Sequence, residues 1–188
     1  DEDFIEAAAF LCASGRRKGV PSLQIARFHR EREKPYAIPD PDERNTAFFN
    51  LHLEWFREWG LEKLLTDLLK EFPLLPAKLN VLAVRKTRNK NDDGAELYVN
   101  EAGQRSAILA LRPESFERDA ALRDYVRHEF THLSDMLAPT FGYAPVLDLP
   151  GLNGAQQRLA RERYRLLWDI TIDGRLTAAG HMPMAGRE

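Results

Sequence analysis

The stretch YVRHEFTHLSDML, residues 125–137, contains His128, Glu129 and His132 in the order H-E-x-x-H. Two histidines four positions apart on a helix differ by about 40° in direction, so both can bind one metal ion from the same side. Zinc suits them, because a catalytic zinc site uses three protein ligands and leaves a fourth position for water. The motif therefore predicts one zinc ion held by His128 and His132, with Glu129 as the general base that accepts a proton from this water.

The helix that carries the motif is expected to span residues 119–137, with Pro139 as its stop. At about 100° per residue its side chains fall on three faces. The apolar face holds Leu122, Val126, Phe130, Leu133 and Leu137, and a polar face holds Arg123, Arg127, Thr131 and Ser134. A third face holds His128, His132 and Asp135, which predicts a ligand face. The alternative is that this third face is ordinary solvated surface, with Asp135 paired to His132.

A third metal ligand is needed, and Asp135 lies too far along the helix, about 7.5 Å from the midpoint of the two histidines. We expect Asp135 to orient a neighbour or to cap the helix end. A better source is YRLLWDITIDGRL, residues 164–176, where Asp169 and Asp173 stand in an apolar run. A buried carboxylate needs a partner such as a metal ion or a metal-bound histidine. The helical pattern that precedes this segment favours a helix, although residues 168–173 also alternate as a strand with one wet face would.

Together these features resemble the zincin metallopeptidases, and within them the gluzincin branch. The resemblance covers roughly residues 79–176, and HEFTH is its specific element. It implies Asp169 as third ligand and Asp173 as the carboxylate that holds the first histidine. Aspartate stands here where the family usually has glutamate, so Glu162, seven residues before Asp169, is an alternative ligand.

Two further residues near the motifs, Tyr143 and Arg175, could also take part in the site or its surroundings. Tyr143, in the loop TFGYAP, could donate a hydrogen bond to the oxyanion, as a tyrosine often does in zincins, or it could be a packed loop aromatic. Arg175 is expected to form a salt bridge with Asp173.

The rest of the chain predicts an α+β fold in one zincin-like domain, residues 1–188. Residues 1–72 form a helical N-terminal part, with helices expected at 3–12, 23–30, 43–59 and 61–71. A small sheet of about three strands follows, at 79–85, 95–100 and 107–112, with a hairpin between the last two. The C-terminal helix, starting near Asn153, should face the HEFTH helix. These two helices and the sheet make up residues 79–176.

The composition argues against a nucleic-acid-binding protein and against a membrane-spanning one. Among 188 residues, 27 Lys and Arg stand against 29 Asp and Glu, a net charge of −2 that argues against nucleic-acid binding. No run approaches the roughly 18 apolar residues of a membrane span, and the first residues show no signal peptide. With one cysteine, Cys12, the sequence indicates a cytoplasmic protein without a membrane partner.

The expected function is a zinc-dependent hydrolase, most simply a peptidase that acts on a peptide or protein substrate. The alternative is a noncatalytic metal-binding or helical interaction module with a zincin-like fold. Substrate preference and oligomeric state stay open, because both depend on surfaces that the sequence does not define.

Overall fold

The computed structural model describes residues 1–146 and 149–184, and its architecture is α+β, as the sequence predicts. The helices are α1 (Glu2–Ala13), α2 (Ser22–Arg32), α3 (Pro41–Glu58), α4 (Leu61–Lys70), α5 (Leu74–Lys78), α6 (Asp119–Leu137) and α7 (Gly154–Ala178). The strands are β1 (Val81–Lys86), β2 (Gly94–Val99) and β3 (Arg105–Leu111). Short 3-10 turns occupy Lys34–Ala37, Lys90–Asp92 and Pro113–Glu117.

The three strands form one mixed sheet in the order β1-β3-β2. Strand β2 pairs antiparallel with β3, so the predicted hairpin is confirmed. Strand β1 runs parallel to β3, with Leu82 opposite Ala107, and the intervening chain crosses over through β2. As the central strand, β3 is the most buried, and its Ala107, Leu109 and Leu111 enter the core.

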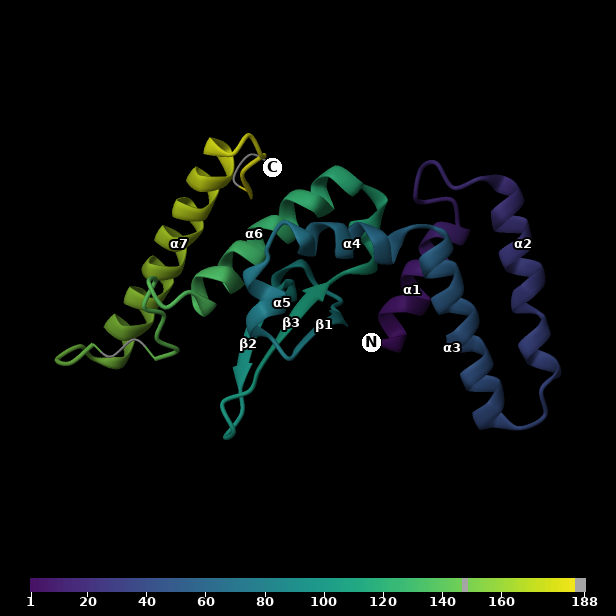
Figure 1. Ribbon diagram of the computed structural model, residues 1–188, viewed down its shortest axis with the longest axis horizontal. Coiled ribbons are helices and arrows are strands. Elements are labelled where there is room, and N and C mark those ends of the chain that lie inside the picture. Colours follow the sequence, from purple (N-terminus) through teal and green to yellow (C-terminus); the bar gives the residue numbers. More distant parts are fainter. Residues whose placement is uncertain (147–148, 185–188) are drawn as a thin grey trace.

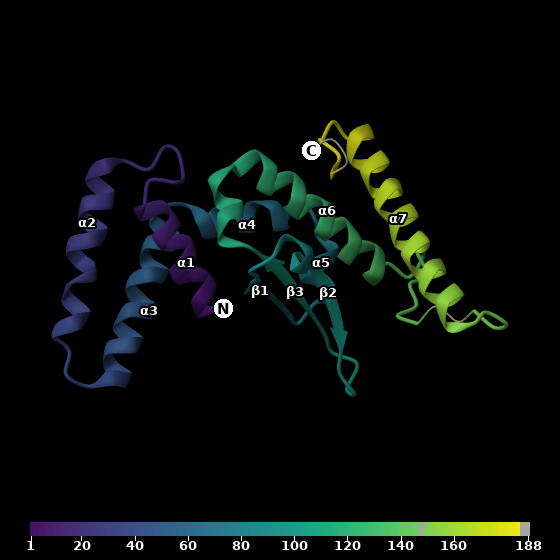
Figure 2. The ribbon, with the colours of Figure 1, turned by 180° about the vertical axis from the view of Figure 1, so that it is seen from behind.

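The elements form three successive groups along the molecule (Figures 1 and 2). Helices α1, α2 and α3 gather at one end, the sheet lies in the middle with α4, α5 and α6, and α7 stands at the other end. The apolar face predicted for α6 is buried in full, and it joins α1, α3, α4 and β3 in one hydrophobic core. Helix α7 adds only two fully buried apolar side chains, Ile172 and Leu176, and these lie outside that main cluster.

Local capping places the two helices that carry the candidate site. Helix α6 ends at Leu137, two residues before Pro139, as expected. Helix α7 begins after Asn153, whose side chain accepts hydrogen bonds from the backbone N–H groups of Ala155 and Gln156. The Gln156 side-chain oxygen in turn accepts a hydrogen bond from the Asn153 backbone N–H, which completes a capping box. Residues 168–173 are therefore helical, and the strand alternative for them is wrong.

Among the described residues, no helix combines the length and apolar character needed to cross a membrane.

Candidate metal centre

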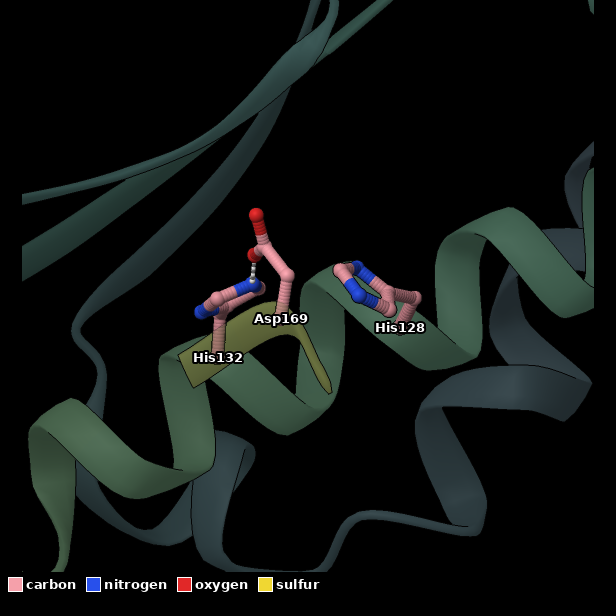
Figure 3. A group of neighbouring side chains, drawn as sticks. All are labelled: His128, His132 and Asp169. Carbon is pink, nitrogen blue, oxygen red and sulfur yellow. Dashed lines mark hydrogen bonds and ion pairs between the residues drawn. The ribbon is translucent and has the colours of Figure 1, made fainter. Parts of the chain in front are cut away.

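The two motif histidines lie on the face of α6 that α7 covers, and Asp169 reaches them from α7 (Figure 3). His128 is 4%, His132 9% and Asp135 6% exposed, although none of them belongs to the apolar face of the helix. The alternative that this third face is solvated surface is therefore wrong. The two imidazoles and Asp135 are thus buried, whereas the Asp169 side chain, which approaches from α7, is 40% exposed.

The geometry of the cluster is compatible with a metal ion. One ligand atom each from His128, His132 and Asp169 lies within 4.8 Å of the other two. His132 Nε2 and Asp169 Oδ1 are hydrogen-bonded at 2.8 Å. Ligands of a tetrahedral zinc ion at about 2.0–2.2 Å from the metal are about 3.4 Å apart, so small side-chain rotations would bring this set into range. Among the described residues this is the one group of three or more histidine, cysteine or acidic side chains that meets this spacing.

His128 is surrounded by carboxylates. Its Nδ1 lies 3.4 Å from Glu129 Oε1, and its Nε2 lies 3.7 Å from Asp173 Oδ1. The buried Nε2 makes no hydrogen bond within the described part of the chain. Burial acts to lower the pKa of His128, but the hydrogen bond and charge of Glu129 and the charges of Asp173 and Asp169 outweigh it and raise that pKa. The surroundings of this imidazole thus favour a positive charge.

Asp173 occupies the position beside the first histidine that the resemblance implies for it. Its Oδ1 also accepts the backbone N–H of Met184 at 2.8 Å, so the residues after α7 turn back toward the site. Its role as the carboxylate that holds His128 stays a prediction.

Glu129 bridges α6 and the sheet. Its Oε2 accepts the backbone N–H of Ala95, on strand β2, at 2.8 Å, while Oε1 faces His128. Nearby, burial, together with the charges of Glu129 and Asp93, raises the pKa of Tyr125. The carboxylate proposed as base is therefore fixed between the first histidine and an edge strand. No sequence signal could indicate the Ala95 contact, because it depends on how α6 crosses β2.

Asp135 orients neighbours, as expected, and it lies outside the metal cluster. It accepts a hydrogen bond from Trp168 Nε1 at 2.7 Å and two from the Arg175 guanidinium, of which the Nη1 bond is 2.9 Å. The expected Arg175–Asp173 salt bridge is wrong. Residues two apart on a helix differ by about 200° in direction, which turns Arg175 away from Asp173 and onto Asp135.

Trp168 is the residue that the sequence interpretation missed. Its ring lies edge-on to His132, with 4.5 Å between centroids, and it also stacks on Phe141 at 5.1 Å. The sequence did hold a signal for a role of Trp168 in the site. Trp168 stands next to Asp169, and a buried indole N–H needs a hydrogen-bond acceptor. The ring centroid of Tyr143 lies 5.9 Å from that of Trp168, so Tyr143 packs beside this ring. Its role as a donor to the oxyanion stays a prediction. Glu162 is exposed and is not part of the cluster.

Comparison of the chain with known protein families, curated proteins and solved structures finds no match. Function therefore has to be argued from the residues and their geometry.

Proposed function

We propose that this protein is a zinc-dependent hydrolase that cleaves peptide bonds, with Glu129 as the general base. The observation that carries the proposal is the cluster of two buried histidines, His128 and His132, with the half-exposed Asp169 and with a carboxylate adjacent to the first histidine. The orphaned Nε2 of His128 and the donor set of two imidazoles and one carboxylate fit zinc. These are the same residues, the HEFTH element and the downstream acidic pair, on which the resemblance to gluzincins rests.

Each residue has a distinct part in this proposal. His128, His132 and Asp169 would hold the ion, which when bound supplies Lewis acidity and lowers the pKa of a water molecule toward neutrality. Glu129 accepts the proton that this water loses and later delivers it to the leaving amine. Asp173 keeps the His128 ring in place, and the Ala95 amide keeps the Glu129 carboxylate in place. Trp168 closes the side of His132 that would otherwise meet solvent.

A noncatalytic metal-binding module is the second candidate, and one contact favours it. Glu129 Oε2 already accepts a hydrogen bond from Ala95, so this carboxylate also fastens α6 to β2. In a purely structural site that contact would be the whole function of Glu129. The two candidates differ in what Glu129 must do, and so a conservative substitution there separates them.

The test combines metal content with peptide hydrolysis in the same preparations. Purified parent protein should carry one zinc per chain by inductively coupled plasma mass spectrometry, and it should cleave members of a broad peptide library. Glu129→Gln preserves shape and removes basicity, so cleavage should fall by about 10²–10⁴-fold while zinc content stays at the parent value. Glu101→Gln, in an exposed turn, is the matched control and should retain full activity.

Two outcomes would contradict the proposal. Equal cleavage by the parent and Glu129→Gln would reject the role of Glu129. Zinc binding by the parent without cleavage of any peptide would favour the noncatalytic module.

A further inference from the structure

Three arginines of α7, Arg158, Arg161 and Arg165, lie in a row that leads to Asp169. They point about 20°, 80° and 40° around the helix from Asp169, all in the same sense, with a mean of about 45°. The residues through which α7 contacts α6 or is buried are Trp168, Asp169, Ile172 and Leu176. Their mean direction is also about 45° from Asp169 in that sense. The basic row, as we call the three arginines, is therefore on the side of α7 that carries the candidate metal centre.

The charges of the basic row are not neutralised by the protein. All three arginines are exposed, and none forms an ion pair with a residue that the structure describes. Glu162 is the one acidic residue in the segment 154–168, and it lies close to the row, about 20° from Asp169 in the opposite sense. Three positive charges against one negative charge give this face a net charge of +2. The whole chain has a net charge of −2, so the row is a local positive surface on an acidic protein.

The N-terminal half of α7 reverses the usual amphipathic arrangement. A surface helix normally turns its apolar side chains toward the protein and its charged ones toward solvent. In α7 the apolar Leu159, Leu166 and Ile170 are exposed on another side of the helix, while the arginines share the direction of the buried Ile172 and Leu176. This half of the helix extends past the last turn of α6 (Figures 1 and 2). Packing of α7 against the molecule therefore does not account for where the arginines point.

The spacing of the basic row suits an extended peptide. At 1.5 Å per residue, Arg165, Arg161 and Arg158 stand about 6, 12 and 16 Å from Asp169 along the helix axis. One residue of an extended chain spans about 3.3 Å, so these distances correspond to about two, four and five peptide residues. The guanidinium group pairs with carboxylates through two parallel hydrogen bonds. A peptide that runs from the metal centre along α7 therefore brings its side chains within reach of the row.

We propose that the basic row selects peptide substrates with acidic side chains two to five residues from the scissile bond. This inference rests on the proposed function, because the row determines which peptides reach the same site. The arginines contact carboxylates that are remote from the reacting atoms, so they strengthen substrate binding rather than bond cleavage. Because all three are exposed, salt should screen the attraction.

Peptide binding tests the proposal without requiring cleavage. The probe is a labelled peptide of about 12 residues with four glutamates at one end, and its counterpart has glutamine at those four positions. Fluorescence anisotropy with the zinc-loaded Glu129→Gln variant of the full chain should show at least tenfold tighter binding of the glutamate peptide at low salt. In about 0.5 M salt the difference should fall to about threefold or less.

Two triple variants locate the preference. Arg158→Gln/Arg161→Gln/Arg165→Gln should abolish it. Lys18→Gln/Arg30→Gln/Arg163→Gln removes the same three charges from exposed positions outside the row, and it should retain the preference. Arg163 is the closest match, because it lies on the same helix about 170° around from the mean direction of the row. Circular dichroism and thermal unfolding show that each variant is folded.

Cleavage supplies the second readout. The parent should cleave glutamate peptides with a kcat/KM at least tenfold above that of the glutamine peptides, mainly through a lower KM. Equal binding of the two peptides overturns the proposal, and so does an equal loss of preference in both triple variants. Tighter binding of a single-stranded oligonucleotide of the same charge would assign the row to a nucleic acid instead. A binding preference that depends on the row, in a parent that cleaves no peptide, would support the row and reject the proposed function.

Discussion

Two buried histidines in different parts of the molecule have almost the same burial and very different surroundings. His52, on α3, is 3% exposed, and His128, on α6, is 4% exposed. Neither Nε2 atom has a hydrogen-bond partner in the described part of the chain. The ring centroid of His52 lies 5.5 Å from that of Phe10, 6.1 Å from Phe28 and 6.2 Å from Phe48. Burial is the main cause that lowers the pKa of His52.

His128 experiences the same cost of burial, yet its pKa is raised, because Glu129, Asp173 and Asp169 surround it. The N-terminal helices thus use a histidine as one more aromatic ring. Helices α6 and α7 instead place a histidine among carboxylates, whose charges favour a positive charge at this position. Two histidines of nearly equal burial thus have pKa values shifted in opposite directions, according to the charges of their neighbours.

Metal binding should show the largest contrast between the two histidines. His128→Ala and His132→Ala each leave a two-ligand remnant, so zinc affinity should fall at least 100-fold and stoichiometric binding should be lost. His52→Ala should bind zinc as the parent does, while the cavity left among the aromatic rings lowers the free energy of unfolding by about 2–4 kcal/mol. Zinc titration with a competing chelator measures the first effect, and urea unfolding measures the second. Unchanged zinc occupancy in His128→Ala would place the site elsewhere.

The two aspartates of α7 should differ in their effect on zinc. Asp169 is the proposed third ligand, so Asp169→Asn should lower zinc affinity more than 100-fold. Asp173 lies beside His128, and Asp173→Asn should lower affinity by about 10–100-fold, which is typical of residues that position a ligand. The same chelator competition measures both. A larger loss in Asp173→Asn than in Asp169→Asn would make Asp173 the third ligand.

The N-terminal helices and α7 should be held to the centre of the molecule by different interactions. The N-terminal helices share the main apolar core, whereas α7 contributes only Ile172 and Leu176 as buried apolar groups and relies on the contacts of Asp135. The Arg175 side chain is 46% exposed, so solvent screens this pair, and we expect a coupling of about 1 kcal/mol between Asp135→Asn and Arg175→Gln in a double-mutant cycle. Zinc affinity should fall in step, because α7 carries Asp169. A coupling near zero, with unchanged zinc affinity, would mean that this pair does not hold α7 in place.

Local patterns in the sequence were enough to predict the histidine pair and all the longer helices and strands. The short helix α5 was not predicted, because Pro73 and Pro76 indicated a break in helical structure there. The bounds of α6 follow from its apolar period and Pro139, and the alignment of His128 with His132 follows from helix geometry alone. Contacts between distant segments were harder to predict, because they depend on how the elements pack against one another. Three examples are the parallel pairing of β1 with β3, the Ala95–Glu129 hydrogen bond and the Trp168–Asp135 hydrogen bond. The approach of Asp169 to His132 was anticipated because a carboxylate in an apolar run needs a partner. The Arg175 prediction was wrong because it relied on nearness in sequence rather than on direction around the helix.

The smallest expected effect is the contribution of His52 to the pH dependence of stability. Its pKa is lowered in the folded protein, so the unfolded chain binds more protons between that folded value and the ordinary value near 6.5. The stabilisation from neutral, buried His52 is therefore complete above about pH 6.5 and is lost as the pH falls through the window below it. His52→Leu, close to histidine in volume, removes this titration, so its Tm should drop by a degree or two less than that of the parent between pH 7 and pH 5.5.

His29→Leu, on the exposed side of α2, is the control and should retain the parent's pH dependence. Differential scanning calorimetry of the three proteins measures the difference. Parallel curves for the parent and His52→Leu would mean that His52 takes up a proton in the folded state as readily as in the unfolded chain, which would remove the contrast with His128.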